Sequence, residues 1–205
     1  EWLGEVPEHW SVSRGKTFFG ERDERSTSGE EELLSVSHLT GVTPRSEKNV
    51  NMFLAESFEG YKVCNEGDIV INTMWAWMGA MGSSSLLGIV SPAYNVYFIR
   101  DENLITHHYI DYLIRTPAFI TKATSCSKGV WSSRLRFYPE AFFNVVFALP
   151  PLDEQKKIVA YLDTMLNRYD LIKQECVNSI ALMKERRTAL ISAAVTGKID
   201  VRNAV

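Results

Sequence analysis

The feature that most constrains the fold is a long stretch between Pro151 and Gly197 that contains neither glycine nor proline. Within it, apolar side chains recur at alternating spacings of four and three residues, the period of an amphipathic helix. The pattern predicts one helix over residues 153 to about 196, which is roughly 65 Å long at the usual rise per residue. The positions expected to form its interface are Ile158, Leu162, Met165, Tyr169, Ile172, Cys176, Met183 and Leu190.

A helix of this length carries more apolar surface than a single domain of ordinary size covers. Globular helices average about 11–12 residues, so an apolar stripe that continues for this long favours a partner helix. Ser179 and Arg186 interrupt the stripe, and the contact is therefore not expected to be a simple two-stranded zipper along its whole length. A helix folded back on its own domain is the alternative.

Residues 1–150 have the pattern of a globular domain. Pro150 and Pro151 end it, because proline cannot continue a strand ladder, and Asp153 then supplies an N-cap for the long helix. A shorter helix is expected after Thr106, kinked or divided at Pro117, and another at Pro139. Glu21–Glu32 is expected to be an exposed loop. Strands are predicted at Leu33–Ser37, Tyr61–Cys64, Asp68–Ile71, Asn95–Ile99 and Phe143–Leu149.

The fold class is therefore α+β. We expect one globular domain, residues 1–150, with an irregular mixed sheet and long loops, followed by the helical region, residues 151–205.

Composition restricts the setting more than the function. The chain has 205 residues, of which 45% are apolar, so it can fill one core. Its net charge of −3 does not by itself indicate a nucleic-acid partner. Three cysteines without C-x-x-C spacing are typical of a reducing compartment. No apolar run reaches membrane-spanning length, and the first residues do not resemble a signal peptide, so we expect a cytoplasmic protein without a membrane partner.

Catalytic motifs are not found in the sequence. Gly15-Lys16-Thr17 resembles the end of a phosphate-binding loop, but position 10 is Trp10 instead of the required glycine. The patterns for dinucleotide binding, for a nucleophile elbow and for zinc proteases are absent, and no metal ligands are predicted. The chain is expected to be non-enzymatic.

A candidate nucleic-acid surface lies between residues 115 and 138, where five cations occur with no acidic residue among them. Cations that meet phosphates supply much of the affinity for DNA. In an extended segment Arg134 and Arg136 share one face and could reach phosphates or guanine edges. An ordinary solvated strand edge explains the same pattern equally well. The DNA-binding candidates from this stretch are Lys122, Lys128, Trp131, Ser132, Ser133, Arg134 and Arg136.

A second candidate is the segment I-N-T-M-W-A-W-M-G-A-M-G at residues 71–82. Asn72 has the amide that could read adenine, and Trp75 and Trp77 are larger and more apolar than side chains that are usually exposed. Tyr94 is expected to lie beside the same loop. The competing interpretation is a hydrophobic hairpin that fills the core.

Several of these segments resemble one protein family. W-L-G-E-V-P-E-H-W at residues 2–10 resembles the opening of a half-repeat in specificity subunits of type I restriction–modification systems. L-P-P-L-D-E-Q-K-K-I-V-A-Y-L-D at 149–163 and A-L-I-S-A-A-V-T-G-K-I-D-V-R at 189–202 are similar to the entry and exit of that family's conserved helix. G-D-I-V-I-N-T-M-W-A-W at 67–77 and I-V-S-P-A-Y at 89–94 resemble parts of its target-recognition domains.

The resemblance implies a non-catalytic subunit that binds double-stranded DNA and reads one half of a split site. In this family two such domains are carried on two helices packed antiparallel. Methylation subunits bring S-adenosylmethionine, and motor-nuclease subunits use ATP and magnesium, so this chain itself is expected to hold no cofactor. One domain on one helix implies a half-subunit or a fragment, paired through the helix with a second copy of itself or with the other half-subunit. The alternative function is a coiled-coil adaptor that binds protein only, without DNA contact.

Overall fold

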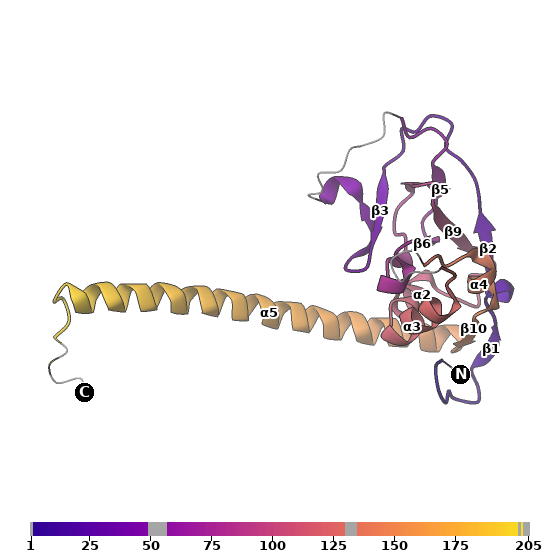
Figure 1. Ribbon diagram of the computed structural model, residues 1–205. Helices are drawn as coiled ribbons and strands as arrows, with labels where there is room; N and C mark the ends of the chain where they lie inside the picture. Colours follow the sequence, from indigo (N-terminus) through magenta and orange to yellow (C-terminus); the bar gives the residue numbers. More distant parts are fainter. Residues whose placement is uncertain (1, 49–56, 130–134, 201, 203–205) are drawn as a thin grey trace. The chain divides into compact units, whose positions relative to one another are not determined.

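The computed structural model describes residues 2–48, 57–129, 135–200 and 202 (Figure 1). The chain divides into two compact units between Val159 and Ala160. The elements, in chain order, are β1 (Ser11–Arg14), α1 (Gly15–Phe18), β2 (Phe19–Arg22), β3 (Leu34–Ser37), β4 (Gly41–Pro44), η1 (Arg45–Glu47), β5 (Lys62–Cys64), β6 (Ile69–Asn72), η2 (Ala76–Met78), β7 (Met81–Ser83), β8 (Gly88–Val90), β9 (Tyr94–Ile99), α2 (His107–Ile114), α3 (Pro117–Cys126), α4 (Pro139–Asn144), β10 (Val146–Leu149) and α5 (Leu152–Val195).

The sheet structure of the first unit is a set of small antiparallel sheets. The largest has the strand order β2-β9-β6-β7, and two-stranded sheets pair β1 with β10, β3 with β4 and β5 with β8. The one parallel pairing among the described residues is an isolated bridge between Leu33 and Ile89. The α+β class is confirmed, with several small antiparallel sheets in place of the expected mixed sheet.

The main core is rich in aromatic residues that come from distant parts of the chain. Phe19, Phe142 and Phe147 are fully buried, and the ring of Tyr97 stacks on Phe142 at a centroid distance of 4.3 Å. Trp2 closes one side of this core through an edge contact with Phe119, at 5.4 Å. Aromatic side chains bury large areas, so this cluster contributes substantially to the hydrophobic stabilisation of the first unit.

The expected division at Pro117 is confirmed. Helix α2 is capped by the Thr106 hydroxyl, which accepts a hydrogen bond from the Tyr109 amide, and α3 is capped in the same way by Thr116. Pro117 occupies the first turn of α3, where its missing N–H costs no hydrogen bond. The helix expected at Pro139 is α4.

The predicted strands are present with shifted ends, while several short strands were missed. Residues 143–145 belong to the end of α4 and the connection after it, so β10 starts only at Val146. The expected loop Glu21–Glu32 begins instead with the last two residues of β2. The strands without a sequence prediction are β1, β2, β4, β7 and β8, each three or four residues long.

The long helix α5 begins at Leu152, and its first two turns belong to the first unit. Asp153 therefore lies inside the first turn and is not the N-cap, although its charge still meets the positive end of the helix dipole. Gln155 is fully buried in this turn. Its side-chain oxygen accepts from the Thr106 amide at 3.0 Å, and its nitrogen donates to the carbonyls of Leu104 and Pro150 at 2.8 and 2.9 Å.

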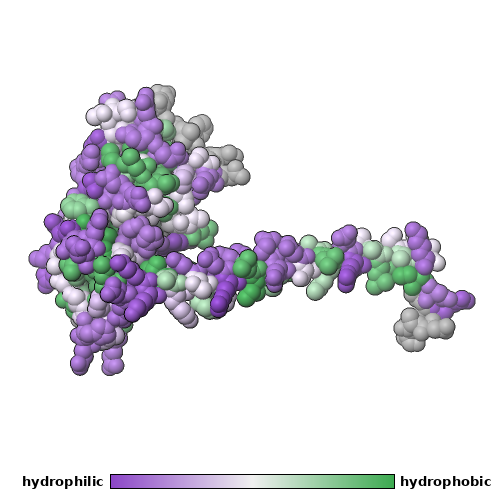
Figure 2. Space-filling view, turned by 180° about the vertical axis from the view of Figure 1, so that it is seen from behind, coloured by the Kyte–Doolittle hydropathy of each residue, from purple (hydrophilic) through white to green (hydrophobic). Residues whose placement is uncertain are grey.

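The second unit consists mainly of the rest of α5, which runs without a break to Val195. Many of its apolar side chains are exposed, including Tyr169 at 61% and Met183 at 67%. Figure 2 shows hydrophobic and hydrophilic surface alternating along the visible face of this helix. No helix in the described ranges combines the length and the apolar character that a membrane span requires.

Candidate nucleic-acid interface

Three loops of the first unit are joined by hydrogen bonds and form the candidate site. The loop between β6 and β7 is connected to the chain after Arg136 because the Phe137 amide donates to the Thr73 carbonyl at 3.2 Å. The Thr73 hydroxyl donates to the Ala93 carbonyl at 3.0 Å, which brings in the loop before β9. We call the described parts of these loops, residues 72–80, 91–94, 128–129 and 135–136, the three-loop surface.

Asn72 shapes the first of these loops. The residue is 7% exposed, its side-chain oxygen accepts from the Met74 amide at 3.2 Å, and its backbone amide donates to Ala80 at 3.0 Å. This places Asn72 at the closed base of the loop, where a structural role competes with the predicted reading of adenine. The adenine contact remains a prediction.

The two tryptophans of this loop have different surroundings. Trp75 is 51% exposed, whereas Trp77 is half-buried and its indole N–H donates to the Met74 carbonyl at 3.1 Å. Gly79 follows with a left-handed φ of 88° and packs against Ile120 of α3. Trp75 is therefore the side chain of the pair with more surface free for a partner.

Tyr94 starts β9 directly opposite Asn72, as expected. It is partly buried, and burial raises the pKa of its hydroxyl, while the nearby Arg45 acts in the opposite direction. Burial and the charge of Arg45 also lower the pKa of Lys48. No local pattern singles out Arg45 and Lys48, because they lie far before Tyr94 in the chain and outside the basic stretch. The repulsion between these two cations identifies them as candidate site residues only once the fold is known.

Three cations of the basic stretch keep some exposed surface that a partner could contact. Lys128 is exposed and Lys122 and Arg136 are half-buried, and within the described residues none of the three has a carboxylate at ion-pair distance. Lys128 and Arg136 form a two-way backbone bridge, with both N–O distances at 2.9 Å. Trp131, Ser132, Ser133 and Arg134 lie outside the described residues.

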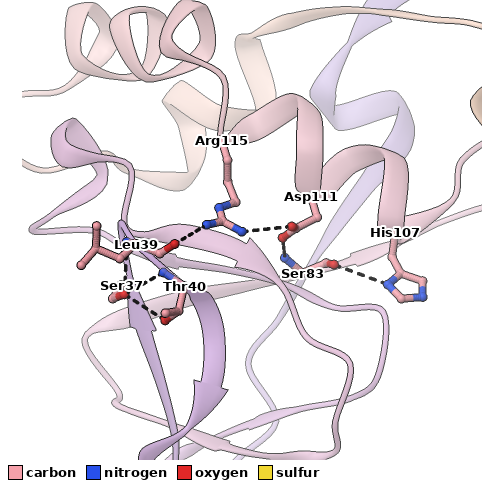
Figure 3. Close-up of polar contacts among 7 residues, drawn as sticks. All are labelled: Ser37, Leu39, Thr40, Ser83, His107, Asp111 and Arg115. Carbon is pink, nitrogen blue, oxygen red and sulfur yellow. Dashed lines mark hydrogen bonds and ion pairs between the residues drawn. The ribbon is translucent and has the colours of Figure 1, made fainter. Parts of the chain in front are cut away.

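Arg115, which opens the basic stretch at residues 115–138, has a structural role (Figure 3). Its guanidinium donates to Asp111 at 3.3 Å and to the Leu39 carbonyl, at the turn between β3 and β4, at 2.8 Å. Asp111 in turn accepts from the Ser83 amide at 2.7 Å. The sequence pattern alone does not reveal this ion pair, because Asp111 lies just before the acid-free stretch at residues 115–138.

A cavity of about 600 Å³ lies elsewhere in the first unit, lined by residues that include Arg22, Asp68, Phe98 and His107. Arg22 and Asp68 are already paired there, at 2.6 Å. Burial, and secondarily the charge of His108, lowers the pKa of His107. Among the residues described, no group of three or more His, Cys, Asp and Glu side chains is arranged to hold a metal ion. None of the residues that line this cavity belongs to the three-loop surface.

The described residues thus define an α+β domain with a loop surface that carries the exposed Trp75 and the cations Lys128 and Arg136, followed by a long amphipathic helix. Residues 3–180 match the family model described as type I restriction modification DNA specificity domain. Because this match includes most of the chain, the protein belongs to that family.

Curated relatives support the same family. The chain is 31% identical over 101 residues to the type I restriction enzyme EcoKI specificity subunit from Escherichia coli strain K12. It is 30% identical over 101 residues to the StySPI specificity subunit from Salmonella potsdam. Each match covers 49% of this chain and 21% of the relative. The chain therefore matches only a part of these longer proteins.

Solved structures share the fold. The HsdS subunit from Thermoanaerobacter tengcongensis is similar with a TM-score of 0.65 and 15% identity, over 98% of this chain and 52% of that one. A chain described under "Structural basis underlying complex assembly and conformational transition of the type I R-M system" is similar with a TM-score of 0.66 and 20% identity. That similarity covers 93% of this chain and 47% of the other. The chain spans about half the length of both.

Proposed function

We propose that this chain is a sequence-specific DNA-binding module of a type I specificity subunit, which reads one half of a split site. The observation that carries the proposal is the three-loop surface, which includes the cations Lys128 and Arg136, on a domain of the specificity-subunit family. Lys122, Lys128 and Arg136 supply phosphate contacts that fix the position of the domain on the duplex. Trp75 and Tyr94 supply apolar and hydrogen-bonding contacts to base edges or sugars.

The cations determine how binding responds to salt. Each lysine that neutralises a phosphate releases condensed counterions, so it contributes about one unit to the slope of log affinity against log salt. Replacing both Lys122 and Lys128 by alanine is expected to weaken binding of a labelled duplex about tenfold or more near 0.1 M salt and to reduce that slope by about 1–2.

The measurement is fluorescence anisotropy with a 40-base-pair duplex pool of random sequence, between about 50 and 200 mM salt. Lys16→Ala is a matched control, since Lys16 is an exposed lysine of the same unit on the short helix α1. Unchanged affinity and slope in the double variant would contradict the assignment. Failure of the unmodified chain to bind any duplex would favour the adaptor function, in which the chain binds only protein.

Chemistry in the complex is assigned to other subunits. Methylation subunits would hold S-adenosylmethionine, and motor-nuclease subunits would use ATP and magnesium, with this chain directing where they act. The proposal therefore predicts that the purified chain alone neither methylates nor cleaves a plasmid, while addition of the partner subunits restores both activities.

The exposed stripe of α5 supports pairing with another helix. The half-buried Leu162 and the exposed Tyr169, Ile172, Cys176 and Met183 recur on one side of the helix. Water-exposed apolar surface of this extent is stabilised by a partner. For identical chains a closed two-fold dimer is the usual solution. We assign this stripe to an antiparallel pair with a second copy or with the other half-subunit.

Light scattering of the purified chain tests the helix pairing. A dimer is expected at tens of micromolar, and a strict monomer with full helical circular dichroism would contradict self-pairing. Pairing with the other half-subunit would then appear only when both chains are mixed.

A second line of exposed apolar residues on α5 offers a docking surface for the methylation subunits. Leu171 and Leu182 are 68% and 50% exposed and stand eleven positions apart, close to three helical turns. They lie away from the stripe that contains Ile172 and Met183, because successive residues point about 100° apart. A two-stranded pair leaves this line uncovered, so it is the surface we assign to docking.

A further inference from the structure

The turn between β3 and β4 exposes side chains that the core does not use. In this turn, which runs from Ser37 to Gly41, His38, Leu39 and Thr40 are all exposed, Leu39 at 75%. Exposure of a single leucine is common on protein surfaces. The feature that distinguishes this turn is the number of contacts that hold its backbone in place.

The turn is ordered from within by the Ser37 hydroxyl. Its oxygen accepts from the amides of Leu39 and Thr40 at 3.3 and 3.1 Å and lies 3.1 Å from the Thr40 hydroxyl. Gly41 completes the turn with a left-handed φ of 67°, a conformation that costs glycine little. These bonds satisfy two backbone donors, so the turn keeps its shape without a partner.

The turn is also held from outside by Arg115. The guanidinium reaches from the end of α2 to the Leu39 carbonyl at 2.8 Å and is itself oriented by Asp111. In Figure 3 the Leu39 side chain points away from the carbonyl that Arg115 binds. The backbone of the turn is thus fixed on one side, and its apolar side chain is presented on the other.

Two glycines allow the turn to approach the central sheet. A methyl group added at Gly82 of β7 would lie 2.9 Å from an Asp111 carboxylate oxygen and 3.2 Å from the Gly41 Cα. Gly82 follows Ala80 by two positions, and Ala80 closes the loop that carries Trp75. The turn is therefore packed against the strand that leaves the three-loop surface.

We infer that the β3–β4 turn is a DNA-contacting element that enters a groove of the duplex, and that Arg115 is the residue that positions it. This inference rests on the proposed DNA-binding function. The tip carries no permanent positive charge, so it is not a phosphate clamp. Leu39 offers apolar contact to a thymine methyl group or to sugars, and His38 and Thr40 offer hydrogen bonds to base edges.

The test separates groove contact from phosphate contact. Duplexes with a randomised centre are selected with the full chain, and the bound pool is sequenced to obtain the preferred bases. Combined replacement of His38 and Leu39 by alanine is expected to lower the enrichment of the preferred sequence about tenfold, since each good base contact discriminates by one to two decades. The salt slope on the unselected pool is expected to stay unchanged.

Leu87→Ala is the matched control, because Leu87 is a 62% exposed leucine that lies after the C-terminal end of β7, away from the β3–β4 turn in the chain. Its enrichment profile should equal that of the unmodified chain. Equal enrichment for the His38 and Leu39 variant, with duplex binding intact, would overturn the inference and leave the proposed function standing. Loss of duplex binding by the unmodified chain would overturn both.

The positioning role of Arg115 is tested by combination. Arg115→Gln is expected to lower enrichment severalfold in the unmodified background and to have no further effect when His38 and Leu39 are already alanine. A purely structural role would lower enrichment equally in both backgrounds, and that result would refute the positioning role. Thermal unfolding of each variant verifies that the domain remains folded during the selection.

Discussion

Gln155 is the residue on which the start of the long helix depends. It is fully buried, and its side-chain amide makes three hydrogen bonds to main-chain atoms at positions 104, 106 and 150. A buried amide with these partners connects the first turn of α5 to the segment before α2. Ile158, a position expected to form the helix interface, is instead partly buried against the main core of the first unit.

Gln155→Ala is expected to destabilise the first unit by about 2–4 kcal/mol, because the Thr106 amide and two carbonyls lose their partner without access to water. Urea unfolding monitored by tryptophan fluorescence measures the change. Gln174→Ala on the exposed part of α5 serves as the control and should change the unfolding free energy by less than about 0.5 kcal/mol. A similarly small effect at Gln155 would contradict this role.

His107 predicts a pH dependence of stability. Burial lowers the pKa of its imidazole below the ordinary value, with a smaller contribution from His108. The unfolded chain then binds a proton more readily than the folded chain as the pH falls below about 6.5. The free energy of unfolding should therefore decrease on acidification from pH 7.5 to pH 5.5.

Comparison with His107→Asn isolates this contribution, because asparagine does not titrate. The decrease between the two pH values should be smaller in the variant than in the unmodified chain. Identical pH profiles for the two proteins would rule out His107 as a source of the dependence.

At the scale of elements, the sequence predicts best where a pattern is long. The period of α5 extends over many turns, and Pro117 and Thr106 mark helix ends by local chemistry, so these elements are predicted correctly. Strands such as β7 and β8 have three residues, too few for an alternating pattern to emerge. Their pairing partners are set by tertiary contacts that no local pattern contains.

The same limit applies to the candidate site. The sequence identifies the segment containing Trp75 as a candidate site because large aromatic residues in a loop are unusual. Its proximity to Tyr94 was also expected. The hydrogen bond from Arg115 to Leu39 joins residues 76 positions apart, and the sequence therefore gave no indication that this arginine supports a turn. Whether a cation is free or paired is decided by the fold.

Gly82 of β7 lies close to Asp111 of α2 and to Gly41 at the start of β4, and this close packing gives a further prediction. Gly82→Ala is expected to destabilise the first unit by about 1–3 kcal/mol, since the added methyl group meets Asp111 and the backbone of Gly41. Urea unfolding measures the loss. Ser85→Ala, an exposed position shortly after β7, is the control and should be nearly neutral.

The two apolar lines of α5 are expected to respond differently to charge. Lysine at both Leu162 and Tyr169 should abolish self-association, because charged side chains in a helix seam are costly to bury. Lysine at both Leu171 and Leu182 should preserve the dimer and weaken capture of the methylation subunit. Light scattering and co-purification provide the two readouts, and an inverted pattern would exchange the two assignments.

At the scale of the whole molecule, the proposed self-pairing would determine the symmetry of the proposed DNA site. Two identical domains related by a two-fold axis read the same half-site in opposite orientations. A homodimer in complex with the methylation subunits should therefore methylate a palindromic sequence interrupted by a fixed spacer. Sequencing of methylated bases in a host that carries the complete system measures this. Two unlike half-sites would instead indicate pairing with a different half-subunit.

The three-loop surface is tied together largely by main-chain atoms: Asn72 to Ala80, Phe137 to Thr73, and Lys128 to Arg136. Main-chain hydrogen bonds do not depend on which side chain occupies a position. Point mutations in these loops can therefore accumulate while the frame that displays them persists. Under the proposed function, a lineage that carries such a module would acquire a new target by small heritable steps, and its partner subunits would not need to change with it.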